Sequence, residues 1–193
     1  MRSDTHLADA GPAPATIGTS PPTGARVACR QAVSADELAL HFAIRHEVFV
    51  EEQSIFAGSD RDSHDARDSV IRLLGFCDGE VAGSVRLFVL DPVAGLWQGD
   101  RLAVLSPFRL RGVGAPLVQC AVAAAAVHGG RLMKAHIQLG NVPFFERLGW
   151  TRADETELYA GLVHQPMHIA LPTVDEGAAV LDRFAAGVNV RGL

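Results

Sequence analysis

A short glycine-bearing turn between an apolar run and a long alanine-rich stretch constrains the fold more than any other part of the chain. Residues 109–115 read Arg-Leu-Arg-Gly-Val-Gly-Ala, between the strand-like run 102–105 and the helix-like stretch 116–127. A helix that begins where a strand ends leaves backbone N–H groups unpaired at the positive end of its dipole. Gly112 and Gly114 let an anion approach these donors. The unit therefore predicts a strand, an anion-binding turn and a helix.

Two arginines, Arg109 and Arg111, place positive charge beside these donors, as phosphate recognition favours. Neither common phosphate motif matches. No Gly-Lys-Ser or Gly-Lys-Thr follows, and the spacing and acidic partner of the dinucleotide fingerprint are missing. The turn is therefore interpreted as a pyrophosphate cradle of another kind, with a plain glycine turn capped by solvated arginines as the alternative.

Length and composition favour one globular domain, because 193 residues with 48% hydrophobic and 20% charged residues can bury one core. A net charge of -5 argues against a nucleic-acid partner. Cys29, Cys77 and Cys120 are widely spaced and odd in number, so we expect buried thiols. The sequence shows neither a signal-peptide pattern nor an apolar run of transmembrane length. We therefore expect a cytoplasmic protein without a membrane partner.

Three segments are expected along the chain. Residues 1–25, rich in Pro, Ala, Gly, Ser and Thr, predict a flexible leader, and residues 26–171 predict the folded domain. Residues 172–193 form an extension in which Leu181, Phe184 and Val188 share one face of a helix over 175–187. We expect that helix to dock on the domain.

The pattern of elements predicts an α/β or α+β fold with helices on both faces of a sheet. A capping box opens the first helix and an Asp-Gly turn joins the second and third strands. Strands are expected at 26–33, 70–77, 81–90, 96–105 and 132–138, with a last pair within 158–171, and helices from Ser34 towards Phe49, at 112–127 and at 143–148.

Three blocks, 44–53, 100–115 and 141–150, occur in an order that resembles the GNAT family of acyl-CoA-dependent N-acyltransferases. The resemblance covers about residues 26–171. Within the family, the chain is similar to a subgroup of small general-type acetyltransferases, on the residues Asp62, Asp65, Gly161, His164 and Met167. The resemblance implies the GNAT fold, whose mixed central sheet splays apart at the acyl-CoA site.

Acetyl-CoA is the co-substrate that the resemblance implies, with no metal. The amides of 110–115 are expected to bind its pyrophosphate, and the backbone of 102–104 to pair with the pantetheine arm as an added strand would. The implied cofactor-binding residues are Leu102, Ala103, Val104, Arg109, Leu110, Arg111, Gly112, Val113, Gly114, Ala115, Asn141, Phe144 and Phe145.

The acceptor pocket implied by the family is bordered by Arg45, Phe49, Glu52 and His164. For Arg45 and Glu52 the alternative is a solvated pair on a helix. His164 and His168 share one face of a strand, which would suit a metal, but no further ligand accompanies them. We therefore interpret His164 as a wall of the pocket.

Asp100 is the candidate catalytic residue, because related sequences often carry a Glu there that accepts the amine proton through water. The alternative is an ion pair with Arg101 or a plain edge residue. The family commonly protonates the leaving thiolate with a Tyr, but this chain has Phe145 at that position. The chain therefore departs from the family at a catalytic point.

The expected function is transfer of an acetyl group to a small-molecule amine, directly and without a covalent intermediate. One alternative is a regulatory module that binds acyl-CoA without turnover, which Phe145 motivates. A second alternative is an acyl-homoserine-lactone synthase, which the first block with Asp62 and Asp65 also resembles. The family often pairs strand edges across a homodimer.

Overall fold

The computed structural model describes residues 24–159 and 161–191. The predicted leader, 1–25, therefore lies outside the described residues except for Gly24 and Ala25, and Ala25 already belongs to the first strand. Among the helices of these residues, none combines the length and apolarity that crossing a bilayer requires.

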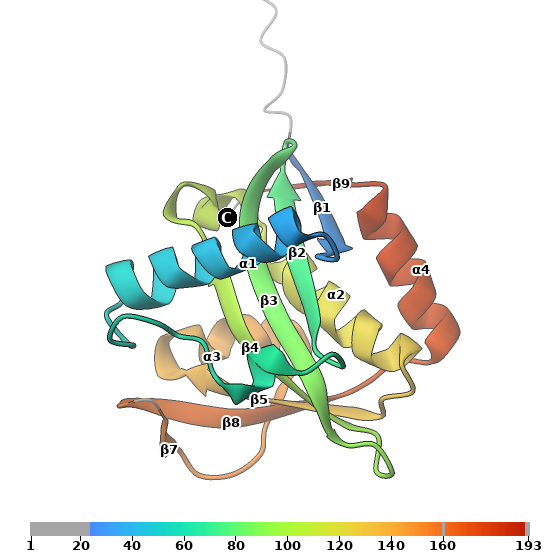
Figure 1. The fold of residues 1–193 in the computed structure, drawn as a ribbon. Coiled ribbons are helices and arrows are strands. Elements are labelled where there is room, and N and C mark those ends of the chain that lie inside the picture. The colour runs from blue at the N-terminus through green and yellow to red at the C-terminus, as the bar shows by residue number, and fades with distance from the viewer. Residues whose placement is uncertain (1–23, 160, 192–193) are drawn as a thin grey trace, which may run out of the picture.

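The strands of the described residues form one mixed sheet, as the sequence predicted (Figure 1). Its order is β6-β8-β5-β4-β3-β2-β1-β9, with β7 paired to β8, and the β4–β5 pair is parallel whereas the other pairs are antiparallel. The bounds are β1 Ala25–Gln31, β2 Ile71–Cys77, β3 Glu80–Asp91, β4 Leu96–Val104, β5 Leu132–Gln138, β6 Thr151–Arg152, β7 Glu157–Tyr159, β8 Leu162–Ala170 and β9 Val188–Val190.

The turn between β2 and β3 confirms the expected hairpin. Asp78 and Gly79 have φ values of 52° and 91°, the left-handed conformation that a two-residue hairpin turn requires and that Asp and Gly tolerate. The turn fixes β2 against β3, with Cys77 opposite Glu80.

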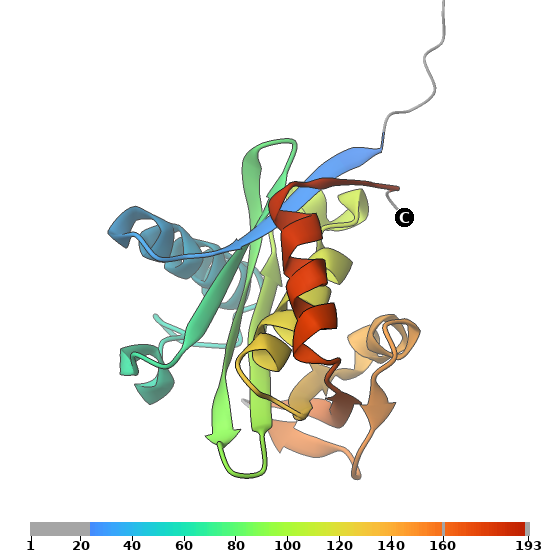
Figure 2. The same cartoon turned by 90° about the vertical axis from the view of Figure 1, so that its right-hand side faces the viewer.

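Four α-helices of the described residues cover both faces of the sheet. They are α1 Ala35–His46, α2 Gly114–Val127, α3 Val142–Arg147 and α4 Val174–Ala185. Figure 2 shows α1 on one face and α2 with α4 on the other. The predicted capping box is present, because Ser34 Oγ accepts from the Glu37 amide while the Glu37 carboxylate accepts from the Ser34 amide. The alanines of α2 are buried against the sheet, as expected.

Two helix predictions differ from the structure in detail. The first helix does not continue as an α-helix to Phe49, because Glu47–Glu52 is a π-helix. The turn before α2 is a 3-10 helix, Ser106–Arg111, so α2 begins at Gly114 rather than at Gly112. Gly112 ends the 3-10 helix in the left-handed conformation, with φ 79°.

The C-terminal helix packs on α2, but it is shorter than predicted. Phe184 belongs to the main core cluster, and Gly177 lies so close to α2 that a Cβ there would be 2.9 Å from the Ala123 carbonyl oxygen. The placement of Val188 on the helix was wrong. Gly187, with φ 77°, ends the turn after α4, and Val188 then pairs with Val27 as part of β9.

The sheet opens between β4 and β5. These strands pair only from Leu96 to Gln98 and from Leu132 to Lys134, after which β4 stays with β3 and β5 stays with β8. Arg101 has a φ of 51°, and the register between β3 and β4 shifts beside it, so β4 carries a bulge where it leaves β5. The predicted splay of the sheet is therefore present.

Replacing Phe184 with Ala will lower the free energy of unfolding by about 3 kcal/mol, because the ring is only 3% exposed and its loss leaves a cavity at the docked helix. Val174→Ala, at the exposed start of the same helix, will change it by less than about 0.5 kcal/mol. Urea denaturation followed by circular dichroism measures both. Equal effects of the two substitutions would contradict the docking of α4.

Candidate functional site

A cavity of about 140 Å³ lies where β4 and β5 part. A cavity of that size is on the order of what a benzene-sized group needs. Part of its wall is apolar and buried, built by Val118 and Ala121 of α2, Met133 of β5, and Phe145 and Trp150. The cavity thus reaches through the opening in the sheet to the helix on its far side.

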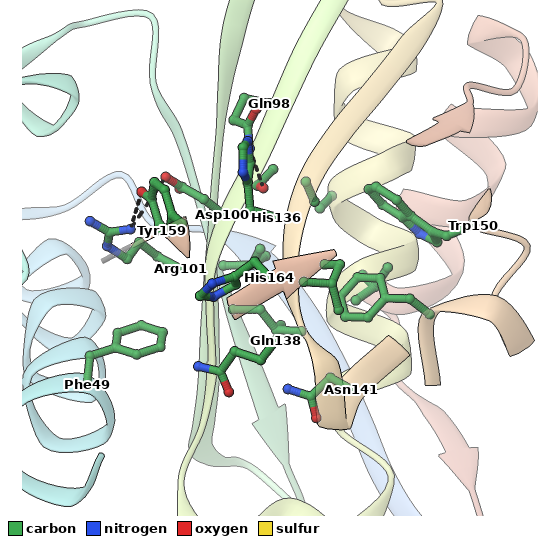
Figure 3. Close-up of a pocket in the computed structure, with 18 of the residues that line it drawn as sticks. Phe49, Gln98, Asp100, Arg101, His136, Gln138, Asn141, Trp150, Tyr159 and His164 are labelled. Carbon is green, nitrogen blue, oxygen red and sulfur yellow. Dashed lines mark hydrogen bonds and ion pairs between the residues drawn. The ribbon is translucent and has the colours of Figure 1, made fainter. Parts of the chain in front are cut away.

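The rest of the wall is polar and comes from several elements. Figure 3 shows these side chains around the cavity, with Phe49 and Trp150 on opposite sides. The polar lining residues are Gln53, Gln98, Asp100, Arg101, His136, Gln138, Asn141, Tyr159 and His164.

The π-helix places Phe49 and Gln53 at the cavity. Its wide turn is closed by the Gln53 amide, which donates to the Val48 carbonyl at 3.0 Å, and the Phe49 carbonyl then accepts from the Ile55 amide at 2.9 Å. Single π-helical turns often occur at functional sites. Here the turn brings the segment after α1 across the opening between β4 and β5.

Beside the cavity lies a network of buried charges that we call the Arg–Asp network. Its cations are on α1, β3 and β4, and its carboxylates are on the segment after the π-helix and on β4. The members are Arg45, Arg86, Arg101, Asp60, Asp62, Asp65 and Asp100.

Arg86 is the centre of the network and has no exposed side-chain surface. Its guanidinium makes two hydrogen bonds to Asp100, of 2.8 and 2.6 Å, and two to Asp62, both of 2.7 Å. Arg45 is equally buried and binds Asp65 at 2.7 and 2.9 Å and Asp60 at 2.7 Å. Paired geometry of this kind compensates the cost of burying the charges.

The network shifts the ionisation of its members. Burial alone would raise the pKa of Asp65, but the hydrogen bonds and charge of Arg45 outweigh it and hold that pKa well below its usual range. His41 lies 3.3 Å from Arg45, and its burial and the arginine's charge lower its pKa to about 3, so that its imidazole is neutral at pH 7. Asp65 therefore stays ionised and His41 stays uncharged at pH 7.

Asp100 lines the cavity, but both of its carboxylate oxygens accept hydrogen bonds from Arg86. The ion pair that we considered as the alternative is therefore present, with Arg86 rather than Arg101 as the main partner; Arg101 Nη1 is 3.8 Å away. Asp100 as the base stays a prediction, and the geometry leaves its oxygens little freedom to accept a further proton.

Two imidazoles and the chain's one tyrosine meet at the polar wall. The Tyr159 ring lies 5.2 Å from the His136 ring and 5.5 Å from the His164 ring, between ring centres. The Tyr159 hydroxyl accepts from Arg101 at 3.3 Å, and His136 pairs with Glu157. This group links β4, β5, β7 and β8 across the opening.

The basic turn lies beyond the cavity wall, at the end of β4. Arg109 Nε donates to the Val104 carbonyl at 3.0 Å, and its Nη2 pairs with Glu52 at 2.6 Å. Arg111 pairs with Asp78 in the hairpin turn. The first turn of α2 has no side-chain cap, which leaves it open to an anion.

Six of the predicted residues line the cavity, and the others lie in the core, on the surface or in the turn before α2. Those that line the cavity are Phe49, Asp100, Leu102, Asn141, Phe145 and His164. Ala103, Val104 and Phe144 lie beside it and are packed in the core clusters. Leu110, Arg109 and Arg111 lie on the surface, whereas Val113 is fully buried. The turn residues Gly112, Gly114 and Ala115 surround the start of α2.

Arg45 and Glu52 lie outside the cavity lining, contrary to expectation. Arg45 points into the Arg–Asp network and has no exposed surface, so it is neither a pocket residue nor a solvated partner of Glu52. Glu52 instead pairs with Arg109, because the π-helix rotates it away from the helix face that α-helical spacing predicts.

The sequence analysis did not identify several of the residues that line the cavity. His136 and Gln138 lie two residues apart on β5 and therefore share one face of that strand. Gln98 is the last residue of β4 that pairs with β5. Alternation within 132–138 marks one face of a strand, but only the topology shows that this face meets the cavity. The sequence analysis did not identify Arg86 either. The one feature that could have indicated its role was a charged residue within an otherwise apolar strand.

Comparison with known proteins identifies a family whose fold has the same open sheet. The model of the acetyltransferase (GNAT) family matches residues 37–150, more than half of the chain. The chain belongs to the GNAT family. It is an acyltransferase, and enzymes of this family use acyl-CoA and act on small-molecule or other amine acceptors.

Similar proteins include an uncharacterised N-acetyltransferase, YjcF of Bacillus subtilis, which is 32% identical over 65% of this chain and 87% of its own length. Among solved structures, an acyl-CoA N-acyltransferase from Pseudomonas aeruginosa is 25% identical, with a TM-score of 0.63 over 75% of this chain and 99% of that one. The CoA-dependent acyl-homoserine lactone synthase BjaI is 20% identical, with a TM-score of 0.61 over 82% and 90%, which shows a shared fold.

Replacing Asp65 with Asn will lower the free energy of unfolding at pH 7 by about 3 kcal/mol, because Arg45 then loses one of its two buried carboxylate partners and Arg86 loses one of its three. The folded-state pKa of Asp65 is depressed, so its contribution is complete above about pH 4, where the unfolded carboxyl titrates, and is lost at lower pH. Urea denaturation from pH 7 to pH 2 will show the two proteins converging. Asp68→Asn, exposed in the same segment, is the control. A stability difference for Asp65→Asn that stays constant down to pH 2 would contradict this account.

Proposed function

We propose that this GNAT acyltransferase transfers the acetyl group of acetyl-CoA to a small-molecule amine by direct attack in a ternary complex. The observation that carries the proposal is the cavity in the opening between β4 and β5, which joins a buried apolar wall to a polar wall. A thioester lying in that opening would present its carbonyl carbon to an amine held at the polar wall.

The end of β4 supports the donor site. Beyond Gln98 this strand pairs with β3 but not with β5, so the edge of Leu102–Val104 faces the opening and would take the amides of a pantetheine arm, with the Val104 carbonyl already accepting one hydrogen bond from Arg109. The same strand leads to the basic turn and to the uncapped start of α2, where a pyrophosphate would meet backbone N–H groups. One extended molecule can therefore follow the strand from the cavity to the turn.

Direct transfer agrees with the placement of the cysteines. Cys29, Cys77 and Cys120 are all buried, and none of them lines the cavity. A covalent acyl-cysteine intermediate needs a thiolate within reach of the thioester. The amine itself is therefore the proposed nucleophile.

Phe145 occupies the cavity wall where the family commonly has a tyrosine. Its ring is buried and packs edge-to-face on Phe144 and Trp150, with ring centres 5.4 Å apart in each case. Coenzyme A is a tolerable leaving group without a protonating side chain, because its thiol is much more acidic than an alcohol. We propose that the thiolate leaves unaided.

Turnover distinguishes this proposal from a module that only binds acyl-CoA. The protein incubated with acetyl-CoA and a panel of polyamines, aminoglycosides, amino acids and arylamines will release free thiol with at least one acceptor. Binding of acetyl-CoA without thiol release from any amine would favour the regulatory module, and a lactone formed from S-adenosylmethionine would favour the synthase. A control without acceptor measures hydrolysis of the thioester.

Removing both arginines of the turn, in the variant Arg109→Ala/Arg111→Ala, will weaken acetyl-CoA binding by roughly tenfold, because two charges beside the pyrophosphate are lost. Isothermal titration calorimetry measures the dissociation constant. Arg183→Ala removes an exposed arginine from α4 and is the control, with unchanged affinity expected. Unchanged binding by the double variant would show that the turn does not hold the donor.

A further inference from the structure

We infer that His164 is the base that removes the proton from the acceptor amine. The inference rests on the proposed function and assigns a catalytic role to a residue that the sequence suggested only as a wall of the pocket. It follows from the hydrogen bonds and burial of the side chains that line the cavity.

The tautomer of His164 is fixed by the backbone. Its Nδ1 lies 2.9 Å from the Leu162 carbonyl oxygen, and a carbonyl can only accept a hydrogen bond. Nδ1 therefore carries the proton, and the neutral ring presents Nε2 as a lone-pair acceptor. A nitrogen held in this state is ready to take a proton.

The position of His164 suits that task. The residue is only 6% exposed, and it lines the cavity from β8, across the opening from Asp100 and Arg101 on β4 (Figure 3). In the register of the sheet it lies opposite Glu157 on β7 and Gln138 on β5. A ring protected from solvent on the polar wall can reach a nucleophile bound there.

Apart from His136, the other titratable groups that face the cavity are poor candidates for the base. Both oxygens of Asp100 accept from Arg86, and Arg101 stays protonated at any ordinary pH. The Tyr159 hydroxyl accepts from Arg101, and a phenol is a poor proton acceptor. His136 is the rival imidazole, because its Nδ1 pairs with the carboxylate of Glu157 and its Nε2 has no partner among the described residues, but its side chain is one-third exposed whereas His164 is buried.

The chemical step balances without a further reactant. The amine nitrogen forms a bond to the thioester carbon while its proton moves to Nε2 of His164. The C–S bond then breaks, and its electron pair leaves with sulfur as the thiolate. The imidazolium finally returns its proton to the thiolate or to water, a return that the positive charge of Arg101 on the same wall favours.

The test is His164→Asn, because the Asn side-chain amide can still donate to the Leu162 carbonyl while the basic nitrogen is lost. With the best acceptor of the panel, kcat will fall at least about a hundredfold. The KM and dissociation constant for acetyl-CoA will stay within twofold. In the wild-type protein kcat/KM will rise with pH as the base loses its proton, and the variant will lose this rise.

The matched control is His168→Asn, on the same strand four residues away and outside the cavity lining, which will keep wild-type kcat. His136→Asn tests the rival imidazole. A second variant, His164→Ala, guards against a folding defect, because added imidazole will restore its activity in proportion to the concentration of free base.

Three results would overturn the inference. They are wild-type kcat in His164→Asn, loss of the pH-dependent rise in His136→Asn instead, and failure of imidazole to rescue a folded His164→Ala protein. In each of these cases an active wild type leaves the proposed function standing. A wild type that transfers no acetyl group to any amine would instead remove both proposals.

Discussion

Arg86 carries its charge in the middle of a sheet without any exposed side-chain surface, so carboxylates inside the protein must balance it. Asp100 comes from the neighbouring strand, whereas Asp62 and Asp65 come from the long polar connection between the π-helix and β2. Removing one partner of such a buried pair costs roughly 3 to 5 kcal/mol. The connection is therefore held against the sheet although little of it is regular structure, and its first residues complete the wall of the cavity. The same charges also engage both carboxylate oxygens of Asp100, although this residue lines the cavity.

Much of the fold could be predicted because its signals are local. The Asp78-Gly79 turn, the capping box at Ser34 and the alternation of the strands each depend on neighbouring residues, and each was found where it was expected. The errors have a different origin. Strand β9 contains only Val188–Val190 and exists because β1 offers it an edge, so the apolar face that placed Val188 on a helix could not distinguish the two. The π-helical turn likewise leaves no local pattern.

Residues of the candidate site could be predicted from the sequence only where they belong to a motif that resembles the family. Phe49 and Asn141 belong to blocks that resemble the family, His164 belongs to the residues that resemble the subgroup, and all three line the cavity. Arg45 belongs to the same first block but turns into the charge network, because helical spacing does not reveal which carboxylates fold back over a helix. His136 is the reverse case, because it belongs to no motif but lines the cavity as a result of the pairing of β5 with β8. Motifs locate a site, whereas its polar wall is set by topology.

With Phe145 in place of a tyrosine, the step that the protein must assist is removal of the amine proton rather than protonation of the leaving thiolate. In a tetrahedral intermediate the two candidate leaving atoms are nitrogen and sulfur, and an unprotonated nitrogen could leave only as an amide anion, a far stronger base than a thiolate. Once the nitrogen has lost its proton, sulfur is the better leaving group, so collapse towards product needs no acid. Before that loss the nitrogen can leave as a neutral amine, so expulsion of the amine competes with expulsion of the thiolate and the intermediate can revert. In the proposed reaction the decisive proton is therefore the one that the oriented imidazole of His164 removes, whereas the apolar Phe145 has no proton to supply.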